Sequence, residues 1–217
     1  MIANNELITG IVVLLIGYFL GSIPTAYIST RLASGKDIRK LGGGNVGGLN
    51  TFREVGIGPA VAVGIVDVGK GAASVAITYW LLDLEPVYVF VAAGAVVVGH
   101  NWMIWLKFRG GMGMGASIGA LAVLMPIYGY AIGLGVLLGI IAIPLVTIRN
   151  VALAMGIGLL VLPFIVWLMD ANSNLPHPGM FVIWSVIVGL IIVVKFAPTT
   201  LASIAKSGNV KDFIRGD

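Results

Sequence analysis

The sequence predicts an all-α integral membrane protein, a polytopic bundle of about seven transmembrane helices. Hydrophobic residues make up 59% of the 217 positions and charged residues only 10%, against about 45–50% and about 25% in soluble domains. The apolar residues also form stretches long enough to cross a bilayer, and the basic residues separate to one side of it. No polar stretch is long enough for a second domain, so residues 1–217 are expected to form a single membrane domain.

Long apolar stretches mark the expected spans, because a helix needs roughly 17–25 mostly apolar residues to cross a bilayer. These stretches cover residues 7–30, 58–82, 86–106, 115–147, 151–169 and 180–196. As one helix, residues 115–147 would be about 50 Å long, too long for a hydrocarbon core about 30 Å thick. We therefore expect two short helices there, with a turn near Pro126–Tyr130.

The basic residues give the orientation of these spans. Twelve of the 13 Lys and Arg residues fall on one side, and the remaining one, Lys70, lies within a span. The opposite side holds only acidic residues: Glu6, Asp83, Glu85 and Asp170. By the positive-inside rule, the N-terminus is expected outside and the C-terminus in the cytoplasm of a bacterial plasma (inner) membrane. Because this topology accounts for the net charge of +4, no nucleic-acid partner is expected.

The loop after the first span is the first candidate site. It contains a formal G-x-G-x-x-G at residues 42–47, but no strand precedes it, which argues against a dinucleotide-binding fold. Glycines still allow several backbone N–H groups to turn toward one anion. An arginine can bind two phosphate oxygens at once. The candidate substrate-binding residues are Gly42, Gly44, Asn45, Gly47, Asn50 and Arg53. The alternative is a flexible, positively charged loop at an anionic lipid surface.

A second glycine-rich loop follows the third span and leads directly into an apolar helix. Free N–H groups and the helix dipole favour phosphate at such a helix N-terminus. The candidate phosphate ligands are the backbone amides of Gly110, Gly111 and Gly113. The chain has no cysteine, which excludes disulfides, thiolate catalysis and cysteine-based metal sites. We expect neither a metal nor a cofactor.

Three ionisable residues, Asp67, Lys70 and His100, fall well inside the predicted spans, away from their ends. Ionisable groups there are costly, so they pair with one another or serve function. Asp67 and Lys70 are three residues apart on one helix face, and they are expected either to line the site or to join helices structurally. His100 is either a catalytic group or a neutral, hydrogen-bonded structural histidine.

In this order, these residues resemble the bacterial acyl-phosphate:glycerol-3-phosphate acyltransferases, the PlsY family. The matching pieces are Gly21-Ser22-Ile23-Pro24, Asp37-Ile38-Arg39, Gly42-x-Gly44-Asn45-Val46-Gly47-x-x-Asn50-x-x-Arg53, Asp67-x-x-Lys70-Gly71, Gly99-His100 and Lys107-Phe108-x-Gly110-Gly111-x-Gly113. The resemblance covers roughly residues 17–117. It implies a seven-helix bundle with a cytoplasm-facing site, and acyl phosphate and glycerol 3-phosphate as substrates beside membrane lipids. It also implies catalytic roles for Arg53 and His100, with Asp67 and Lys70 among the substrate-binding residues.

The sequence departs from the family pattern at four places. Gly43 stands where the family has serine, Leu49 where it has threonine, and Met112 where it has lysine. Residues 195–201 contain neither the histidine nor the asparagine of the family's third motif. Each charged hydrogen bond lost in this way costs about 1.5–3 kcal/mol. The departures therefore bear on the rate more than on the fold.

Three functions are compatible with the sequence. The first is transfer of a fatty acyl group from acyl phosphate to the 1-hydroxyl of glycerol 3-phosphate, which gives lysophosphatidic acid. The second is a catalytically degenerate relative that binds a phosphorylated lipid or lipid precursor, which the departures would explain. The third is a small transporter, although no clear inverted repeat supports it. The acyl-chain length and the oligomeric state do not follow from the sequence.

Overall fold

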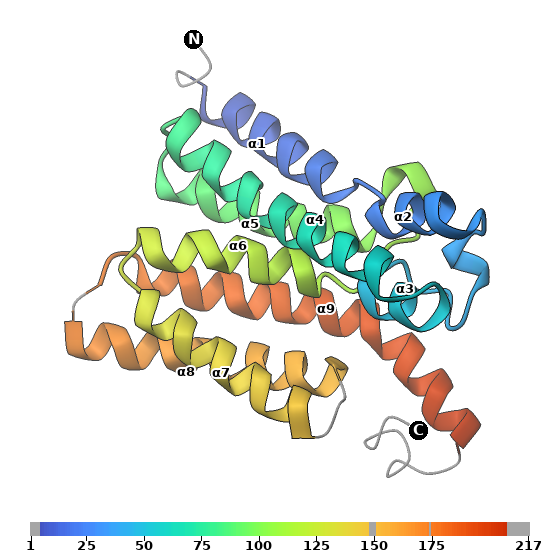
Figure 1. The fold of residues 1–217 in the computed structure, drawn as a ribbon. Helices are drawn as coiled ribbons and strands as arrows, with labels where there is room; N and C mark the ends of the chain where they lie inside the picture. The colour runs from blue at the N-terminus through green and yellow to red at the C-terminus, as the bar shows by residue number, and fades with distance from the viewer. Residues whose placement is uncertain (1–4, 148–150, 174, 208–217) are drawn as a thin grey trace. The chain divides into compact units, whose positions relative to one another are not determined.

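The protein is described by a computed structural model, which covers residues 5–147, 151–173 and 175–207 (Figure 1). All its regular elements in these ranges are helical. The chain divides into two compact units, an N-terminal unit of residues 1–124 and a C-terminal unit of residues 125–217. Arg149, Lys211 and Arg215, which were expected to be cytoplasmic, lie outside the described residues.

The first predicted span is two helices. The helix α1 (Glu6–Gly21) begins at Asn5, whose side chain accepts a hydrogen bond from the backbone N–H of Ile8. It ends just before Pro24, and α2 (Thr25–Ser34) follows. A proline disfavours helical geometry at the preceding residue, here Ile23, so the chain changes direction at this point. The predicted span at residues 7–30 is therefore helical, but it consists of two helices and not of one continuous helix.

The rest of the N-terminal unit is also helical. Its elements are the 3₁₀ turn Ile38–Lys40, α3 (Gly48–Glu54), α4 (Ile57–Ala76) with the π-helical turn Ile77–Leu81, α5 (Pro86–Asn101), the 3₁₀ turn Ile104–Leu106 and most of α6 (Met114–Ile127). The helices α1 and α5 run side by side (Figure 1). A methyl group at Gly21 would collide with the carbonyl oxygen of Val96, and one at Gly119 with that of Val68. Glycine thus lets α1 contact α5, and α6 contact α4, at backbone distance.

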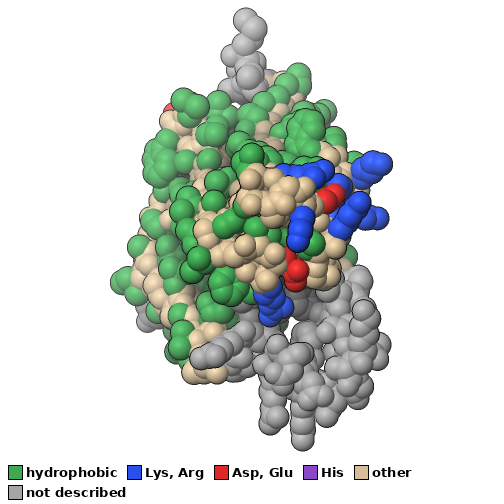
Figure 2. Space-filling view, turned by 45° about the vertical axis from the view of Figure 1, so that its right-hand side comes forward, with side chains coloured by type: hydrophobic (Ala, Val, Ile, Leu, Met, Phe, Trp, Pro, Cys, Tyr) green, Lys and Arg blue, Asp and Glu red, His purple; other side chains and the backbone are tan. Residues whose placement is uncertain are grey.

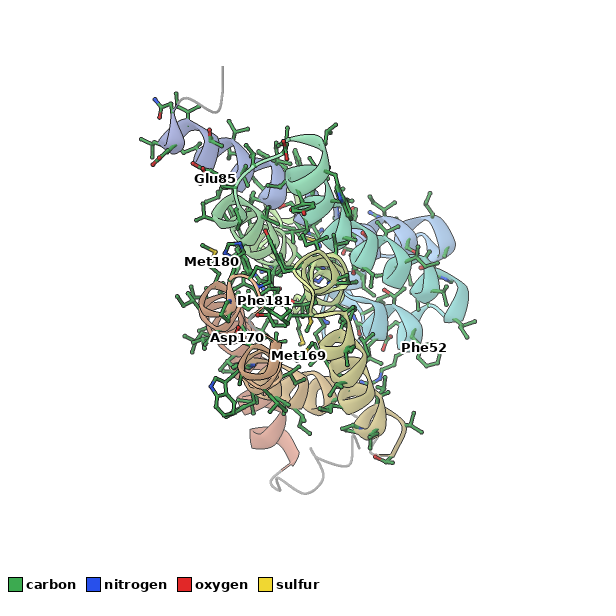
Figure 3. The ribbon with its side chains drawn as sticks, turned by 90° about the vertical axis from the view of Figure 1, so that its left-hand side faces the viewer. Phe52, Glu85, Met169, Asp170, Met180 and Phe181 are labelled. Carbon is green, nitrogen blue, oxygen red and sulfur yellow. The ribbon has the colours of Figure 1, made fainter. Side chains whose placement is uncertain are left out.

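The C-terminal unit contains α7 (Ala131–Thr147), α8 (Val151–Ser173) and α9 (Pro178–Ser207), with α8 packed against both α7 and α9. Phe181, labelled in Figure 3, is fully buried near the beginning of α9. Its ring centroid lies 4.6 Å from that of Tyr130 and 5.9 Å from that of Tyr128. These aromatic contacts fix the loop before α7 against the first turn of α9.

The helices match most of the predicted spans. In the described ranges, four helical segments are long and apolar enough to cross a membrane: Glu6–Ser34, Ile57–Leu81, Pro86–Leu106 and Pro178–Lys195. Three shorter apolar helices are Met114–Ile127, Ala131–Thr147 and Gly156–Ala171. The turn predicted near Pro126–Tyr130 is confirmed, because α6 ends at Ile127 and α7 begins at Ala131. The last helix continues to Ser207, beyond its predicted end at residue 196.

Candidate functional site

An ion pair fixes the segment before the first glycine loop. This loop comprises residues 42–47. Asp37 accepts a hydrogen bond from the backbone N–H of Arg39, and its two carboxylate oxygens lie 3.0 and 2.7 Å from the Arg39 guanidinium nitrogens. These bonds lower the pKa of Asp37 to about 2, because they stabilise the charged carboxylate. The Arg39 guanidinium also lies 5.2 Å from the centre of the Tyr27 ring. The loop therefore leaves α2 along a defined path.

Asn50 determines the shape of the first glycine loop. Its side-chain nitrogen donates to the carbonyl oxygens of Asn45 at 3.0 Å and Leu41 at 3.1 Å. Both Gly42 and Gly44 have positive φ, at +50° and +71°, where a side chain would strain the backbone. A methyl group at Gly42 would also lie 2.6 Å from the Asn50 side-chain oxygen. Asn50 is thus buried inside the loop and holds its carbonyl groups, which leaves the opposite side of the loop for a ligand.

The other candidate residues of this region differ in exposure: Gly47 is buried, Asn45 is half-buried and Arg53 is exposed. Gly47 precedes α3, and its carbonyl oxygen accepts hydrogen bonds from Thr51. Asn45 is half-buried beside it. Arg53 lies on α3 next to Phe52, which is exposed and labelled in Figure 3. The Arg53 guanidinium is exposed and forms no hydrogen bond or ion pair with any residue in the described part of the chain. The Arg53 side chain therefore reaches the solvent and does not line a buried pocket, so its binding role stays a prediction.

Exposed basic side chains surround this region. Figure 2 shows Lys and Arg side chains gathered on one part of the visible surface, beside an extensive hydrophobic surface. The exposed basic residues of the N-terminal unit are Arg31, Lys36, Lys40, Arg53, Lys107 and Arg109. They belong to the segments that carry or flank the two glycine loops. Such a concentration of positive charge attracts anions.

The second glycine loop, Gly110–Gly113, lies against the end of α5. The N–H of Gly111 donates to the carbonyl oxygen of His100 at 3.0 Å. A methyl group at Gly110 would collide with that carbonyl oxygen, and one at Gly111 would collide with His100 Nε2. Lys107 and Phe108 both have positive φ, at 55° and 60°, so the chain turns sharply before the loop. The glycines are required because the loop backbone contacts α5 directly.

The two glycine loops meet at Gly111. A methyl group there would lie 2.8 Å from the carbonyl oxygen of Val46, which belongs to the first loop. One buried hydrophobic cluster supports both loops: it includes Ile38 and Val46 beside the first, and Met103 and Leu106 just before the second. Segments about 65 residues apart in the sequence therefore form one site.

The N-terminus of α6 completes this site. Gly113 has φ of +76° and directly precedes the helix, and its carbonyl oxygen accepts the N–H of Ser117 at 2.9 Å. The first N–H groups of a helix have no partner within the helix, and the helix dipole makes this end attractive to anions. The 14 residues of α6 make the dipole substantial. The predicted glycine loop thus leads directly into a helix N-terminus, and its phosphate-binding role stays a prediction.

Asp67 and Lys70 lie beneath the loops, inside the helix packing. The Lys70 amine lies 2.8 Å from Asp67 Oδ1 and donates to the carbonyl oxygen of Ile23 at 3.2 Å. His100 Nδ1 lies 3.6 Å from the same Asp67 oxygen. The pair joins α4 to the break between α1 and α2 and to the end of α5. The pair therefore fits both alternatives predicted from the sequence. It joins helices structurally, and it also lies beside the candidate site residue His100. Within the described ranges, no group of three or more His, Asp or Glu residues is placed to bind a metal.

Two buried polar residues of the site were missed by sequence reasoning. Asn101 has no exposed surface and Ser117 is 1% exposed, and neither side chain finds a hydrogen-bond partner in the described part of the chain. The Gly113 methyl position lies 2.8 Å from Asn101 Oδ1. The sequence did offer one signal, because an amide side chain beside His100 at the end of an apolar span is costly unless it has a role.

Known proteins resemble this chain over most of its length. A family model described as "Glycerol-3-phosphate acyltransferase" matches residues 11–206. The "Glycerol-3-phosphate acyltransferase 1" of Dehalococcoides mccartyi is 46% identical over 201 residues, which are 93% of this chain and 94% of that protein. The "Glycerol-3-phosphate acyltransferase 2" of the same organism is 36% identical over 209 residues, 95% and 94% of the two chains.

Among solved structures, the chain resembles PlsY (YgiH), an integral membrane glycerol 3-phosphate acyltransferase. The crystal structure of its glycerol 3-phosphate form matches with a TM-score of 0.73 at 20% sequence identity, over 92% of each chain. The lysophosphatidic acid form matches with a TM-score of 0.69. At this identity the match concerns the fold, which is that of an integral membrane protein.

Proposed function

We propose that this chain, which belongs to the glycerol-3-phosphate acyltransferase family, transfers a fatty acyl group from acyl phosphate to the 1-hydroxyl of glycerol 3-phosphate. The products are lysophosphatidic acid and inorganic phosphate. The observation that carries the proposal is the contact of Gly111 with His100 and Val46, which brings the two glycine loops together. Two substrates that each carry a phosphate group require such a paired site. The family names of the relatives support the same reaction.

The chemistry requires mainly that two phosphate groups be positioned. An acyl phosphate is already activated, so the hydroxyl oxygen attacks the acyl carbon, the bond from that carbon to the phosphate oxygen breaks, and phosphate leaves. The hydroxyl proton passes to His100 Nε2, which lies at the junction of the loops. Holding both substrates in this geometry removes much of the entropic barrier. No metal or cofactor takes part in this scheme.

Each loop has a separate role in this scheme. The amides of Gly110, Gly111 and Gly113 and the N-terminus of α6 bind one phosphate group. The Arg53 guanidinium and the Asn45 side chain bind the other, on the first glycine loop that Asn50 shapes. Asp67 and Lys70 contribute from below, because Asp67 lies beside His100 Nδ1 and orients its ring.

The membrane topology is part of the proposal. Four long and three shorter apolar helices suffice for seven crossings, with the N-terminus outside and both glycine loops at the cytoplasmic face of the bacterial plasma membrane. Since the chain has no cysteine, single-cysteine variants test this topology. Asp83→Cys should react with a membrane-impermeant maleimide in intact cells, and Lys36→Cys only after permeabilisation. The reverse pattern would exclude the orientation.

Turnover is tested with purified protein, acyl phosphate and glycerol 3-phosphate, measuring phosphate and lysophosphatidic acid in equal amounts. Arg53→Ala should lower kcat/KM about 10- to 150-fold, which corresponds to about 1.5–3 kcal/mol for a lost charged hydrogen bond. Lys36→Ala is the matched control, because Lys36 is an exposed basic residue outside the glycine loop. Full activity of Arg53→Ala would exclude the assigned role of Arg53.

The departures from the family pattern make one other outcome informative. Gly43 is exposed with no atom near its methyl position, and Met112 is half-buried, so neither position supplies a polar group to a substrate. Substrate binding without release of phosphate would indicate the degenerate, ligand-binding relative instead. Complementation of a strain that lacks the first acylation step of phospholipid synthesis tests the same distinction in cells.

A further inference from the structure

Asn101, the last residue of α5, has a side chain that the fold does not explain. It has no exposed surface, and neither its Nδ2 nor its Oδ1 has a hydrogen-bond partner in the described part of the chain. Buried amide groups nearly always have such partners, because water supplies them in the unfolded chain and their loss destabilises the fold. An apolar residue of similar size would occupy this position at lower cost. The amide therefore calls for a role outside the packing of the ligand-free protein.

The position of Asn101 indicates where that role lies. The methyl position of Gly110 is 2.7 Å from the Asn101 carbonyl oxygen, and that of Gly113 is 2.8 Å from Asn101 Oδ1. Backbone and side chain of Asn101 thus lie directly beneath the two ends of the second glycine loop. Ser117, one turn along α6 from Gly113, also has a buried hydroxyl without a partner in the described part of the chain. Unpaired polar groups therefore gather where α6 begins.

The loop itself supplies only backbone donors. Between Gly110 and Gly113 the one side chain is that of Met112, which carries no charge and no N–H group. A phosphate at this position is held by loop and helix amides alone, so its affinity depends on how accurately those amides point. A group that fixes the loop from beneath consequently has a larger effect here than in a loop with a charged side chain.

We propose that Asn101 is a positioning residue for the phosphate group bound at the N-terminus of α6. With phosphate bound, Asn101 Oδ1 accepts one of the free backbone N–H groups at the start of α6, and this bond turns the neighbouring amides toward the phosphate oxygens. Asn101 acts through the loop and does not touch the substrate. This inference rests on the proposed function, and the phosphate is that of either glycerol 3-phosphate or the acyl phosphate.

The test compares Asn101→Leu with the unsubstituted protein, both full-length and purified in detergent. Leucine has the same number and branching of side-chain heavy atoms as asparagine but no polar atoms, so the melting temperature should stay the same or rise. The KM for one of the two phosphate substrates should rise roughly three- to tenfold, as expected for one lost hydrogen bond. The substrate whose KM rises identifies the phosphate that binds at α6. Unchanged KM values for both substrates would overturn the proposal.

Thr30→Val is the matched control. The Thr30 hydroxyl is also fully buried and has no partner among the described residues. Thr30 lies on α2, however, and not beside the second glycine loop. Its replacement should leave both KM values unchanged. A lower melting temperature in Asn101→Leu would show that the amide is paired within the ligand-free protein, which would also overturn the proposal.

A second variant and a second measurement separate this inference from the proposed function. Asn101→Asp keeps the shape and an acceptor but places negative charge under the phosphate, so it should raise the same KM more than Asn101→Leu does. The substrate whose KM rises, and inorganic phosphate, should raise the melting temperature of the unsubstituted protein more than that of either variant. This stabilisation requires binding but no turnover. If neither variant folds, Asn101 is structural and the inference is wrong, whereas absent turnover with normal stabilisation contradicts only the proposed reaction.

Discussion

Gly111→Ala gives the sharpest test of the site, because one methyl group there meets both glycine loops. The methyl would collide with His100 Nε2 and would lie 2.8 Å from the Val46 carbonyl oxygen. Atoms of the backbone cannot move away as a flexible side chain does, so the second loop has to shift. Adding a methyl to a well-packed position costs about 1–3 kcal/mol. At about 2–4 °C per kcal/mol for a chain of this size, the melting temperature should fall by roughly 2–12 °C.

The effect on catalysis should exceed the effect on stability. A displacement on the order of 1 Å of the phosphate-binding amides reduces a rate by about 10²-fold. The assay is kcat/KM for phosphate release, measured beside thermal unfolding in the same detergent. Gly43→Ala is the matched control, since Gly43 is exposed, has no atom within 4 Å of its methyl position and belongs to the other glycine loop. It should change the unfolding free energy by less than about 0.5 kcal/mol. If Gly111→Ala retained full activity, or Gly43→Ala were equally impaired, the two loops would not meet as described.

Two further predictions concern the ion pairs. Lys70→Met leaves the buried Asp67 carboxylate without its partner and should lower the unfolding free energy by about 3–5 kcal/mol. Adding Asp67→Leu should restore most of this loss in thermal unfolding. A double variant as unstable as the single one would exclude the pairing. Arg39→Ala should let the pKa of Asp37 rise from about 2 toward its ordinary value. The carboxyl of Asp37 has a pKa of about 4 in the unfolded chain, and its lowered pKa in the fold stabilises the fold above that pH. The unsubstituted protein should therefore be more stable than Arg39→Ala above pH 4, and this difference should vanish as the pH falls to about 2. A difference in melting temperature that did not change over this range would contradict the assignment.

Hydropathy predicted where the helices lie but not how they bend. The turn near Pro126–Tyr130 followed from length alone, because a single helix over residues 115–147 could not fit the bilayer. The break at Pro24 was missed, because hydropathy measures how apolar a stretch is and does not register the backbone restriction that a proline imposes on Ile23. The extension of α9 to Ser207 was missed for the opposite reason, because the residues after 196 are too polar for a span but continue the helix.

The sequence predicted where the two glycine loops lie but not how the side chains around them are oriented, and the binding roles of these residues stay predictions. Glycine spacing identified both loops, because few other residues allow positive φ and close backbone contact. The helix α3 has seven residues, too few for a hydrophobic period to show which side chains point inward. Their orientation depends on packing instead. Asn50 accordingly points into the loop while Arg53 is exposed. Asn101 was missed since its burial depends on the second loop folding back over the end of α5.

The origin of phosphate affinity distinguishes this site from one built on charged side chains. The second loop offers amides and a helix N-terminus, and the nearest charges beneath it, Asp67 and Lys70, are already paired with each other. Loss of an exposed basic residue therefore removes long-range attraction, which salt also weakens. Loss of loop geometry removes the binding itself, whatever the salt concentration. Substitutions at Gly111 and Asn101 should accordingly raise KM equally at low and high ionic strength, whereas the effect of Arg53→Ala on KM should shrink as salt increases.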